Sequence, residues 1–240
     1  MANGEPTLDI NLGKSIEKLK SLDIPIAVIT NASMLHSSMV RDKLQFANWV
    51  SVKIDTGDEA IWRKLNRPTT ALNFDMYLAG LLEFSQVYKG KLTSETILVK
   101  GINDTTDALQ KTAGLVSMVN PAIANISIPT RPPAINTVTP PDENVITEAY
   151  HIFSENMLNI ELTLGFEGTG NGFTGNATED ILNICAVHPI REDTMHELLR
   201  KNKADFAVLK DLLNKELIQK IIYKSSTFYL RKFQKKEIEK

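Results

Sequence analysis

Charged and polar side chains recur in this chain at points where a stretch of buried apolar residues ends. Ser51, Lys53 and Asp55 alternate with apolar residues, so a strand over 49–55 would turn a hydroxyl, a base and an acid toward one side. Similar groups follow other expected strands, namely Glu5, Asn31, Lys100, Asn103 and Arg131. Groups of these types hold charged or hydroxylated small molecules, although several could instead cap helices or form turns.

Histidine and cysteine do not form a metal-binding pattern in this sequence. His36, His151, His188 and His196 share no metal-ligand spacing. The single cysteine, Cys185, falls on the expected buried face of a helix, where a small core side chain is the simpler interpretation. One cysteine also excludes a cluster held by several thiolates of this chain alone. We therefore expect no metal site within these 240 residues, and we identify no catalytic residue.

The elements that must position the polar groups alternate between strand and helix. Strands are expected at 26–29, 49–55, 93–99, 124–128 and 160–164, and helices at about 12–22, 37–46, 59–65, 74–88, 104–119 and 142–157. Few hairpin signals interrupt this order, so we predict an α/β fold with a parallel sheet. In such folds the chemistry gathers where the strands end, which is where the polar groups fall.

The pattern changes after residue 164. The glycine-rich stretch 165–176 predicts a flexible linker, because its G-x-G-x-x-G lacks the βαβ unit of a dinucleotide site. Residues 177–240 show three short helices and a hairpin with its tip near 224–226, which is typical of a winged helix. We therefore predict a domain over 1–164, a linker over 165–176 and a winged-helix-like module over 177–240.

Charge divides the chain in a similar place. Residues 1–187 carry 14 Lys and Arg against 21 Asp and Glu, a net −7, whereas residues 188–240 carry 13 against 8, a net +5. The basic end would suit a phosphate backbone such as that of tRNA, or a protein partner. No apolar run is long enough to span a membrane and no signal-like core is present, so we expect a cytoplasmic protein.

Six stretches in order resemble the radical S-adenosylmethionine (radical SAM) iron–sulfur oxidoreductases, specifically their archaeal and bacterial branch with a C-terminal winged helix. The stretches are Gly4–Thr7, Thr30–Asn31, Ser51–Asp58 with Asn66–Pro68, Val99–Asp104, Pro129–Pro133 and Val187–Asp193. The resemblance implies a partial (β/α) barrel of the TIM type. It also implies a [4Fe–4S] cluster that reduces S-adenosylmethionine, and a 5′-deoxyadenosyl radical that abstracts a substrate hydrogen.

The resemblance also assigns roles to individual residues. Glu5 in the Gly4-Glu5 turn matches the acid that receives the cofactor's ammonium group, a charge-assisted hydrogen bond that requires an anion. Ser51, Lys53 and Asp55 match the strand that faces ribose and carboxylate. Asn31, Asn103 and Thr130 complete the expected cofactor-binding set, and Arg131 is expected to bind a substrate carboxylate or phosphate.

The chain departs from this family at the cluster. The family's C-x-x-x-C-x-x-C loop precedes the Gly-Glu-Pro turn, and this chain begins after that point. We therefore expect a truncated form that does not bind the cluster alone. The loss of the first strand and most of the second would leave an unpaired edge, a template for dimerisation.

Two other functions remain open. The chain could be a non-catalytic protein that binds a nucleoside through Glu5, Asp55 and Asn103, and RNA or a partner through 177–240. A hydrolase using Lys53 and Asp55 is the least favoured, because no set of nucleophile, base and orienting group is visible. The substrate cannot be read from the sequence.

Overall fold

The computed structural model describes residues 4–133, 135, 137–155, 159–163, 174–187, 189–223 and 225–232. The chain divides into two compact units. The N-terminal unit comprises residues 2–129 and 137–164, and the C-terminal unit comprises residue 1, residues 130–136 and residues 165–240. No helix among the described residues is both long enough and apolar enough to cross a membrane.

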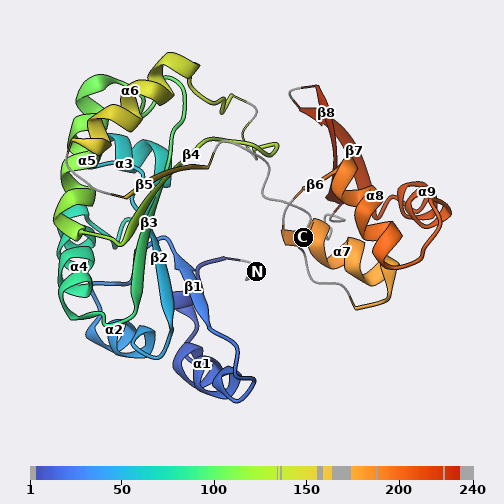
Figure 1. Ribbon diagram of the computed structural model, residues 1–240, viewed down its shortest axis with the longest axis horizontal. Coiled ribbons are helices and arrows are strands. Elements are labelled where there is room, and N and C mark those ends of the chain that lie inside the picture. The colour runs from blue at the N-terminus through green and yellow to red at the C-terminus, as the bar shows by residue number, and fades with distance from the viewer. Residues whose placement is uncertain are drawn as a thin grey trace, which may run out of the picture. The chain divides into compact units, whose positions relative to one another are not determined.

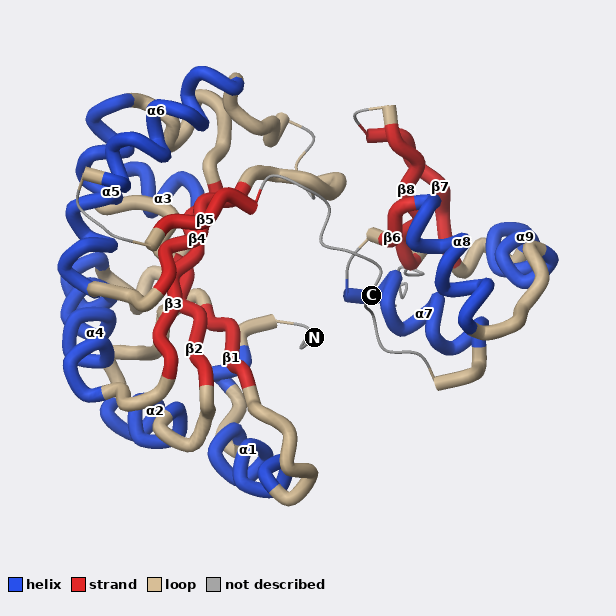
Figure 2. The backbone as a smooth tube through the Cα atoms, in the orientation of Figure 1, coloured by secondary structure: helices blue, strands red, loops and turns tan. Residues whose placement is uncertain are grey.

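The N-terminal unit contains a five-stranded parallel sheet in the order β1-β2-β3-β4-β5, the same as the order along the chain (Figure 2). The strands are β1 (Ala27–Thr30), β2 (Trp49–Lys53), β3 (Lys91–Ile97), β4 (Ile123–Ser127) and β5 (Ile160–Thr163). The helical elements are η1 (Pro6–Leu8), α1 (Leu12–Lys20), α2 (Ser38–Leu44), α3 (Glu59–Asn66), α4 (Phe74–Val87), α5 (Thr106–Val119) and α6 (Glu143–Ser154). The predicted parallel α/β sheet is thus confirmed.

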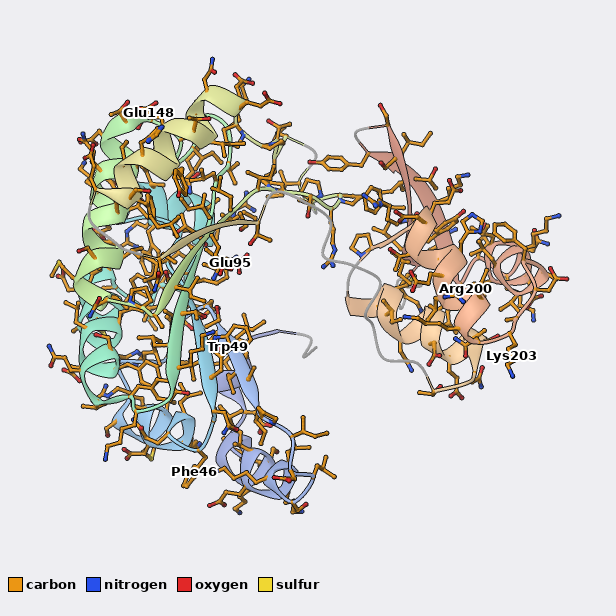
Figure 3. All side chains as sticks on the ribbon, viewed as in Figure 1. Phe46, Trp49, Glu95, Glu148, Arg200 and Lys203 are labelled. Atoms are coloured by element: carbon orange, nitrogen blue, oxygen red, sulfur yellow. The ribbon has the colours of Figure 1, made fainter. Side chains whose placement is uncertain are left out.

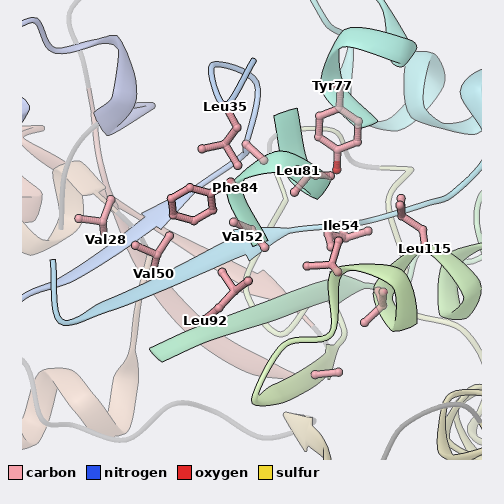
Figure 4. Close-up of a cluster of buried hydrophobic side chains, with 14 of the residues drawn as sticks. Val28, Leu35, Val50, Val52, Ile54, Tyr77, Leu81, Phe84, Leu92 and Leu115 are labelled. Carbon is pink, nitrogen blue, oxygen red and sulfur yellow. The ribbon is translucent and has the colours of Figure 1, made fainter. Parts of the chain in front are cut away.

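The two faces of this sheet differ in chemistry. Helices α2, α4 and α5 lie along one face (Figure 1), and the strand residues that meet them are apolar and buried. Val50, Val52 and Phe84 are fully buried in this layer (Figure 4). The other face carries a polar row, because the register pairs Lys53 with Glu95 and continues it through Asn125 and Glu161. The alternation expected along 49–55 is therefore present over β2, which ends at Lys53, whereas Asp55 follows the strand.

Local hydrogen bonds set the ends of these elements. β3 ends at Ile97 rather than at the expected Val99, because the side chain of Asn103 accepts the backbone N–H of Val99 and takes it out of the ladder. Helix α5 begins after Thr105, whose hydroxyl accepts the N–H of Ala108. Helix α3 begins after Asp58, whose carboxylate accepts the N–H groups of Ala60 and Ile61. Each cap satisfies a donor that a helix leaves unpaired.

The C-terminal unit packs three helices on a three-stranded antiparallel sheet of order β6-β8-β7. The elements are α7 (Ala177–Val187), β6 (Ile190–Arg191), α8 (Glu192–Lys201), α9 (Ala207–Asn214), β7 (Ile218–Tyr223) and β8 (Ser226–Arg231). Strand β6 was not foreseen, because two residues are too few to show a period. Of the features expected here, residues 165–173 of the linker, His188 and Lys224 at the hairpin tip lie outside the described residues.

Cys185 belongs to the core of the C-terminal unit. It is 5% exposed and packs in one cluster with Ile181, Met195 and Leu209. Burial raises the pKa of its thiol to about 12, so the sulfur stays protonated and unreactive at neutral pH. The sequence-based interpretation as a core side chain is correct.

Candidate functional site

The carboxylate of Glu5 is fixed against the end of β1. Its Oε1 accepts hydrogen bonds from the N–H of Thr7 (3.0 Å), the hydroxyl of Thr7 (2.6 Å) and the hydroxyl of Thr30 (2.6 Å). Its Oε2 accepts only one, from the N–H of Asn31 (2.7 Å). Gly4 precedes it with φ +109°, a conformation that favours glycine. Because each carboxylate oxygen can accept about two hydrogen bonds, the remaining capacity lies at Oε2.

Glu5 also lines a cavity of about 460 Å³, within the usual range for small-molecule sites. The polar lining residues are Glu5, Asn31, Ser33, His36, Asn66, Arg67 and Thr69, and the apolar ones are Leu8, Met34, Trp62, Pro68, Ala71, Leu72 and Tyr77. They come from η1 and the residue before it, from the segment that follows β1, from α3 and the segment after it, and from α4. The cavity therefore opens beside the end of β1 and joins segments far apart in the sequence.

The end of β2 is tied to β3 by a buried network. Asn103, 1% exposed, donates to the backbone oxygens of Asp55 and Ile97, both at 2.8 Å, and accepts the N–H of Val99. The Asp55 carboxylate, also buried, accepts the N–H of Ile97 (3.0 Å) and the side-chain amide of Asn66 (2.9 Å). Both side chains thus hold strand ends in place, and Asp55 connects this network to the cavity wall at Asn66.

Lys53 lies on the polar face of the sheet between two acids. Its Nζ is 4.0 Å from Oδ1 of Asp55 and 3.9 Å from Oε2 of Glu95. The hydroxyl of Ser127 donates to the other oxygen of Glu95 at 3.0 Å. Ser51, on the same strand, forms no hydrogen bond through its hydroxyl with any other described residue. Figure 3 labels Trp49 and Glu95, which lie on the side of the sheet away from α4 and α5.

Aromatic rings form the inner wall of the cavity. The ring of Trp62 lies 5.3 Å from that of Phe74 and 5.4 Å from that of Tyr77, between centroids. The hydroxyl of Tyr77 donates to the backbone oxygen of Lys53 at 3.0 Å. Burial, reinforced by the charge of Asp55, raises the pKa of Tyr77 far above its usual value. The phenol therefore stays neutral and acts as a donor that locks α4 to β2.

The structure distributes the predicted site residues over several places. Glu5 and Asn31 line the cavity, with Gly4 in the adjoining turn, whereas Ser51 and Lys53 lie on the sheet face and Asp55 and Asn103 lie in the network between the strands. Thr130 and Arg131 belong to the C-terminal unit. Sequence reasoning did not assign a site role to His36, Trp62 or Arg67, three lining residues.

The sequence around Arg67 contained a pattern that could have marked it as a site residue. Arg67 stands between Asn66 and Pro68 directly after a helix, where a proline restricts the preceding backbone.

Among the residues that the structure describes, no group of three or more His, Cys, Asp or Glu side chains is placed to hold a metal ion.

No protein-family model matches the chain. It is 39% identical over 239 residues to a UPF0026 protein of Methanocaldococcus jannaschii, and the match covers 99% of this chain and 74% of that protein. It is 30% identical over 216 residues to a protein of Brachyspira hyodysenteriae named GTPase Obg, covering 89% of this chain and 31% of that one. The G-x-x-x-x-G-K-[S/T] loop that cradles nucleotide phosphates is absent from this sequence.

Two solved structures have a similar fold. A domain of pyruvate-formate lyase-activating enzyme from Bacteroides vulgatus matches with a TM-score of 0.55 at 15% identity, over 68% of this chain and 96% of that one. Streptococcus suis SuiB bound to S-adenosylmethionine matches with a TM-score of 0.52 at 13% identity, over 68% of this chain and 38% of that one. At these identities the similarity establishes the fold.

Proposed function

The chain belongs to the UPF0026 family, and we propose that it binds S-adenosylmethionine at the strand ends of its N-terminal unit, as a relative of the radical SAM enzymes. The observation that carries this proposal is the Glu5 carboxylate, held by Thr7, Thr30 and Asn31 with acceptor capacity left at the wall of a ligand-sized cavity. The similar fold of a protein bound to S-adenosylmethionine supports it.

The donor set of the N-terminal unit fits this cofactor. Oε2 of Glu5 can accept a hydrogen bond from the α-ammonium group, and the three donors on Oε1 hold the carboxylate in place. The Ser51 hydroxyl and the Lys53 ammonium, which lies between Asp55 and Glu95, are the groups of the sheet face that would meet a hydroxylated group such as ribose. Asp55 and Asn103 hold the strand ends that carry these groups. The bound cofactor would supply the adenosyl group.

The same residues do not fit a [4Fe–4S] cluster. The sequence contains one cysteine, and Cys185 is buried and protonated in the core of the C-terminal unit. A cluster of this kind requires several thiolates. We therefore assign no step of reductive cleavage to these 240 residues, and the whole reaction would need thiolates that this sequence does not contain.

Calorimetric titration of the purified chain with S-adenosylmethionine tests the proposal. We expect saturable binding that Glu5→Gln weakens about tenfold, because one charge-assisted hydrogen bond is lost. Glu17→Gln, on the exposed side of α1, is the matched control and should leave the affinity unchanged. If the wild-type chain does not bind S-adenosylmethionine, the proposal is contradicted.

Reconstitution with iron and sulfide tests the statement about the cluster. We expect no [4Fe–4S] absorption, and its appearance would refute that statement.

A second candidate function belongs to the C-terminal unit, for which we propose a winged-helix-like role in binding RNA or a protein. The order α7-β6-α8-α9-β7-β8 with the sheet order β6-β8-β7 supports this. Its basic charge is partly neutralised, because Lys220 pairs with Glu192 and Lys232 pairs with Glu216.

We also propose that two copies of the chain can form a dimer through the edge strand β1. The dimer would use the edge of β1 that does not pair with β2.

A further inference from the structure

Arg67 is held in an unusual conformation at the cavity wall. It follows α3 as the C-cap residue with φ 48° and ψ 56°, the left-handed region that a residue with a side chain adopts at a cost. Its exposed guanidinium forms no ion pair with any residue in the described ranges, and Arg67 lines the same cavity as Glu5. An arginine without a partner beside a cavity is a candidate for binding an anionic group of a ligand.

The surroundings of Arg67 fix its position. Asn66, the preceding residue, donates to the buried carboxylate of Asp55 at 2.9 Å, and Trp62 anchors the same helix against Phe74 and Tyr77. Pro68 fixes the backbone that follows. The end of α3 is therefore held by contacts from the segment after β2 and from α4. A left-handed residue is common directly after a helix, and Asn120 ends α5 in the same way, so this conformation shows only that the backbone at Arg67 is fixed.

Three other cations of this region have acids within 4 Å. Arg63, on the same helix, pairs with Glu59 at 2.7 Å, and Arg41 pairs with Glu83 at 2.6 Å. Lys53 lies about equally far from Asp55 and Glu95. The ion pairs of the described residues include none between Arg67 and Glu5, whose carboxylate is held instead by Thr7, Thr30 and Asn31. Arg67 is thus the lining cation whose charge is left for a ligand.

We infer that the cavity binds a zwitterionic α-aminocarboxylate group, with Arg67 binding the carboxylate and Oε2 of Glu5 accepting from the ammonium. A guanidinium binds a carboxylate through two parallel hydrogen bonds, and one such group matches one negative charge. A phosphate dianion fits less well, because the second charge would meet Glu5. This inference rests on the proposed function, since it assigns the amino-acid end of S-adenosylmethionine to the cavity.

Two simpler roles compete with this assignment. Arg67 could serve only to balance the dipole of α3, because a cation is favourable at the C-terminal end of a helix. Alternatively, Lys53 could bind the carboxylate, as the resemblance to the family implied. The two roles predict different responses to a ligand that lacks the carboxylate, and this difference forms the basis of the test.

The test compares S-adenosylmethionine with its decarboxylated analogue, titrated calorimetrically into the full chain. We expect the wild-type protein to prefer S-adenosylmethionine, and Arg67→Asn to weaken its binding about 10- to 100-fold while leaving the affinity for the analogue unchanged. Asparagine is chosen because it tolerates the left-handed conformation. Arg63→Gln is the matched control on the same helix, and it should retain the full preference.

Other results of these titrations would contradict either the role of Arg67 or the binding of S-adenosylmethionine. Equal weakening of both ligands by Arg67→Asn shows that the residue is structural and overturns the inference. Loss of the preference in Lys53→Met, but not in Arg67→Asn, transfers the carboxylate to Lys53 and also overturns it. If the wild-type chain binds S-adenosylmethionine without preference over the analogue, the inference fails and the proposed function stands. If it binds neither ligand, both fail.

Discussion

At the scale of single residues, Asn103 and Glu5 show two uses of a polar side chain at a strand end. Asn103 is buried, and its three hydrogen bonds all go to backbone groups at the ends of β2 and β3. Glu5 is half-buried and keeps acceptor capacity beside a cavity. Their amino-acid types suggested a ligand role for both. The contacts show that Asn103 positions the strand ends, whereas Glu5 is the residue that can contact a ligand.

Asn103→Ala should therefore act mainly on stability. The substitution leaves one buried N–H and two backbone oxygens without their partner, and we expect the free energy of unfolding to fall by about 3 kcal/mol. Urea denaturation measures this change. Asn11→Ala is the control, because Asn11 is exposed and makes no capping hydrogen bond, so its effect should stay within about 0.5 kcal/mol. Equal effects of the two substitutions would contradict the role given to Asn103.

At the scale of elements, the cavity depends on how closely α4 approaches the segment that follows β1. Gly80 makes this approach possible, because a Cβ atom there would collide with the backbone of Leu35 and His36. The same segment contains Ala32 with φ 64°, a further residue in the left-handed region. His36, which lines the cavity, contacts the backbone oxygen of Ser33 through Nδ1 at 3.0 Å. The wall is thus shaped by helix packing.

Gly80→Ala should push α4 away from this wall. We expect a loss of about 1–3 kcal/mol in the free energy of unfolding, as for other overpacked sites, together with weaker binding of S-adenosylmethionine. Gly114→Ala in α5 is the matched control, because nothing lies within 4 Å of its added Cβ. That substitution should stabilise the protein by about 0.5–1 kcal/mol through helix propensity. A stabilising effect at Gly80 would contradict the close packing.

At the scale of the whole molecule, the two units have cores of their own and opposite net charge. The sheet core includes Val50, Ile54 and Phe84, and the second core is built around Ile181, Met195 and Leu209. Ion pairs reduce the positive charge that the C-terminal unit can offer a polyanion. Arg200, Lys203 and Lys210 carry no ion pair among the described residues, and Figure 3 labels the first two.

Binding of tRNA by the C-terminal unit would depend on these unpaired cations. We expect replacement of Arg200, Lys203 and Lys210 by Gln to weaken a gel shift at low salt, and each lost phosphate contact to lower the salt slope by about 0.7–0.9. Lys220→Gln with Lys232→Gln should have a smaller effect, because both lysines already pair with glutamates. The absence of any shift at low salt would count against the second candidate function.

The sequence by itself determined the alternation of strand and helix, the parallel sheet and the polar side chains that alternate along β2. These features follow from which residues avoid water, and periodicity along the chain reports that directly. Only the tertiary structure decided that the Asn103 amide reaches the backbone of Asp55, 48 residues away, and that Arg67 shares a cavity with Glu5. Such pairings depend on strand register and helix packing, which are set by contacts between distant residues that no local pattern records.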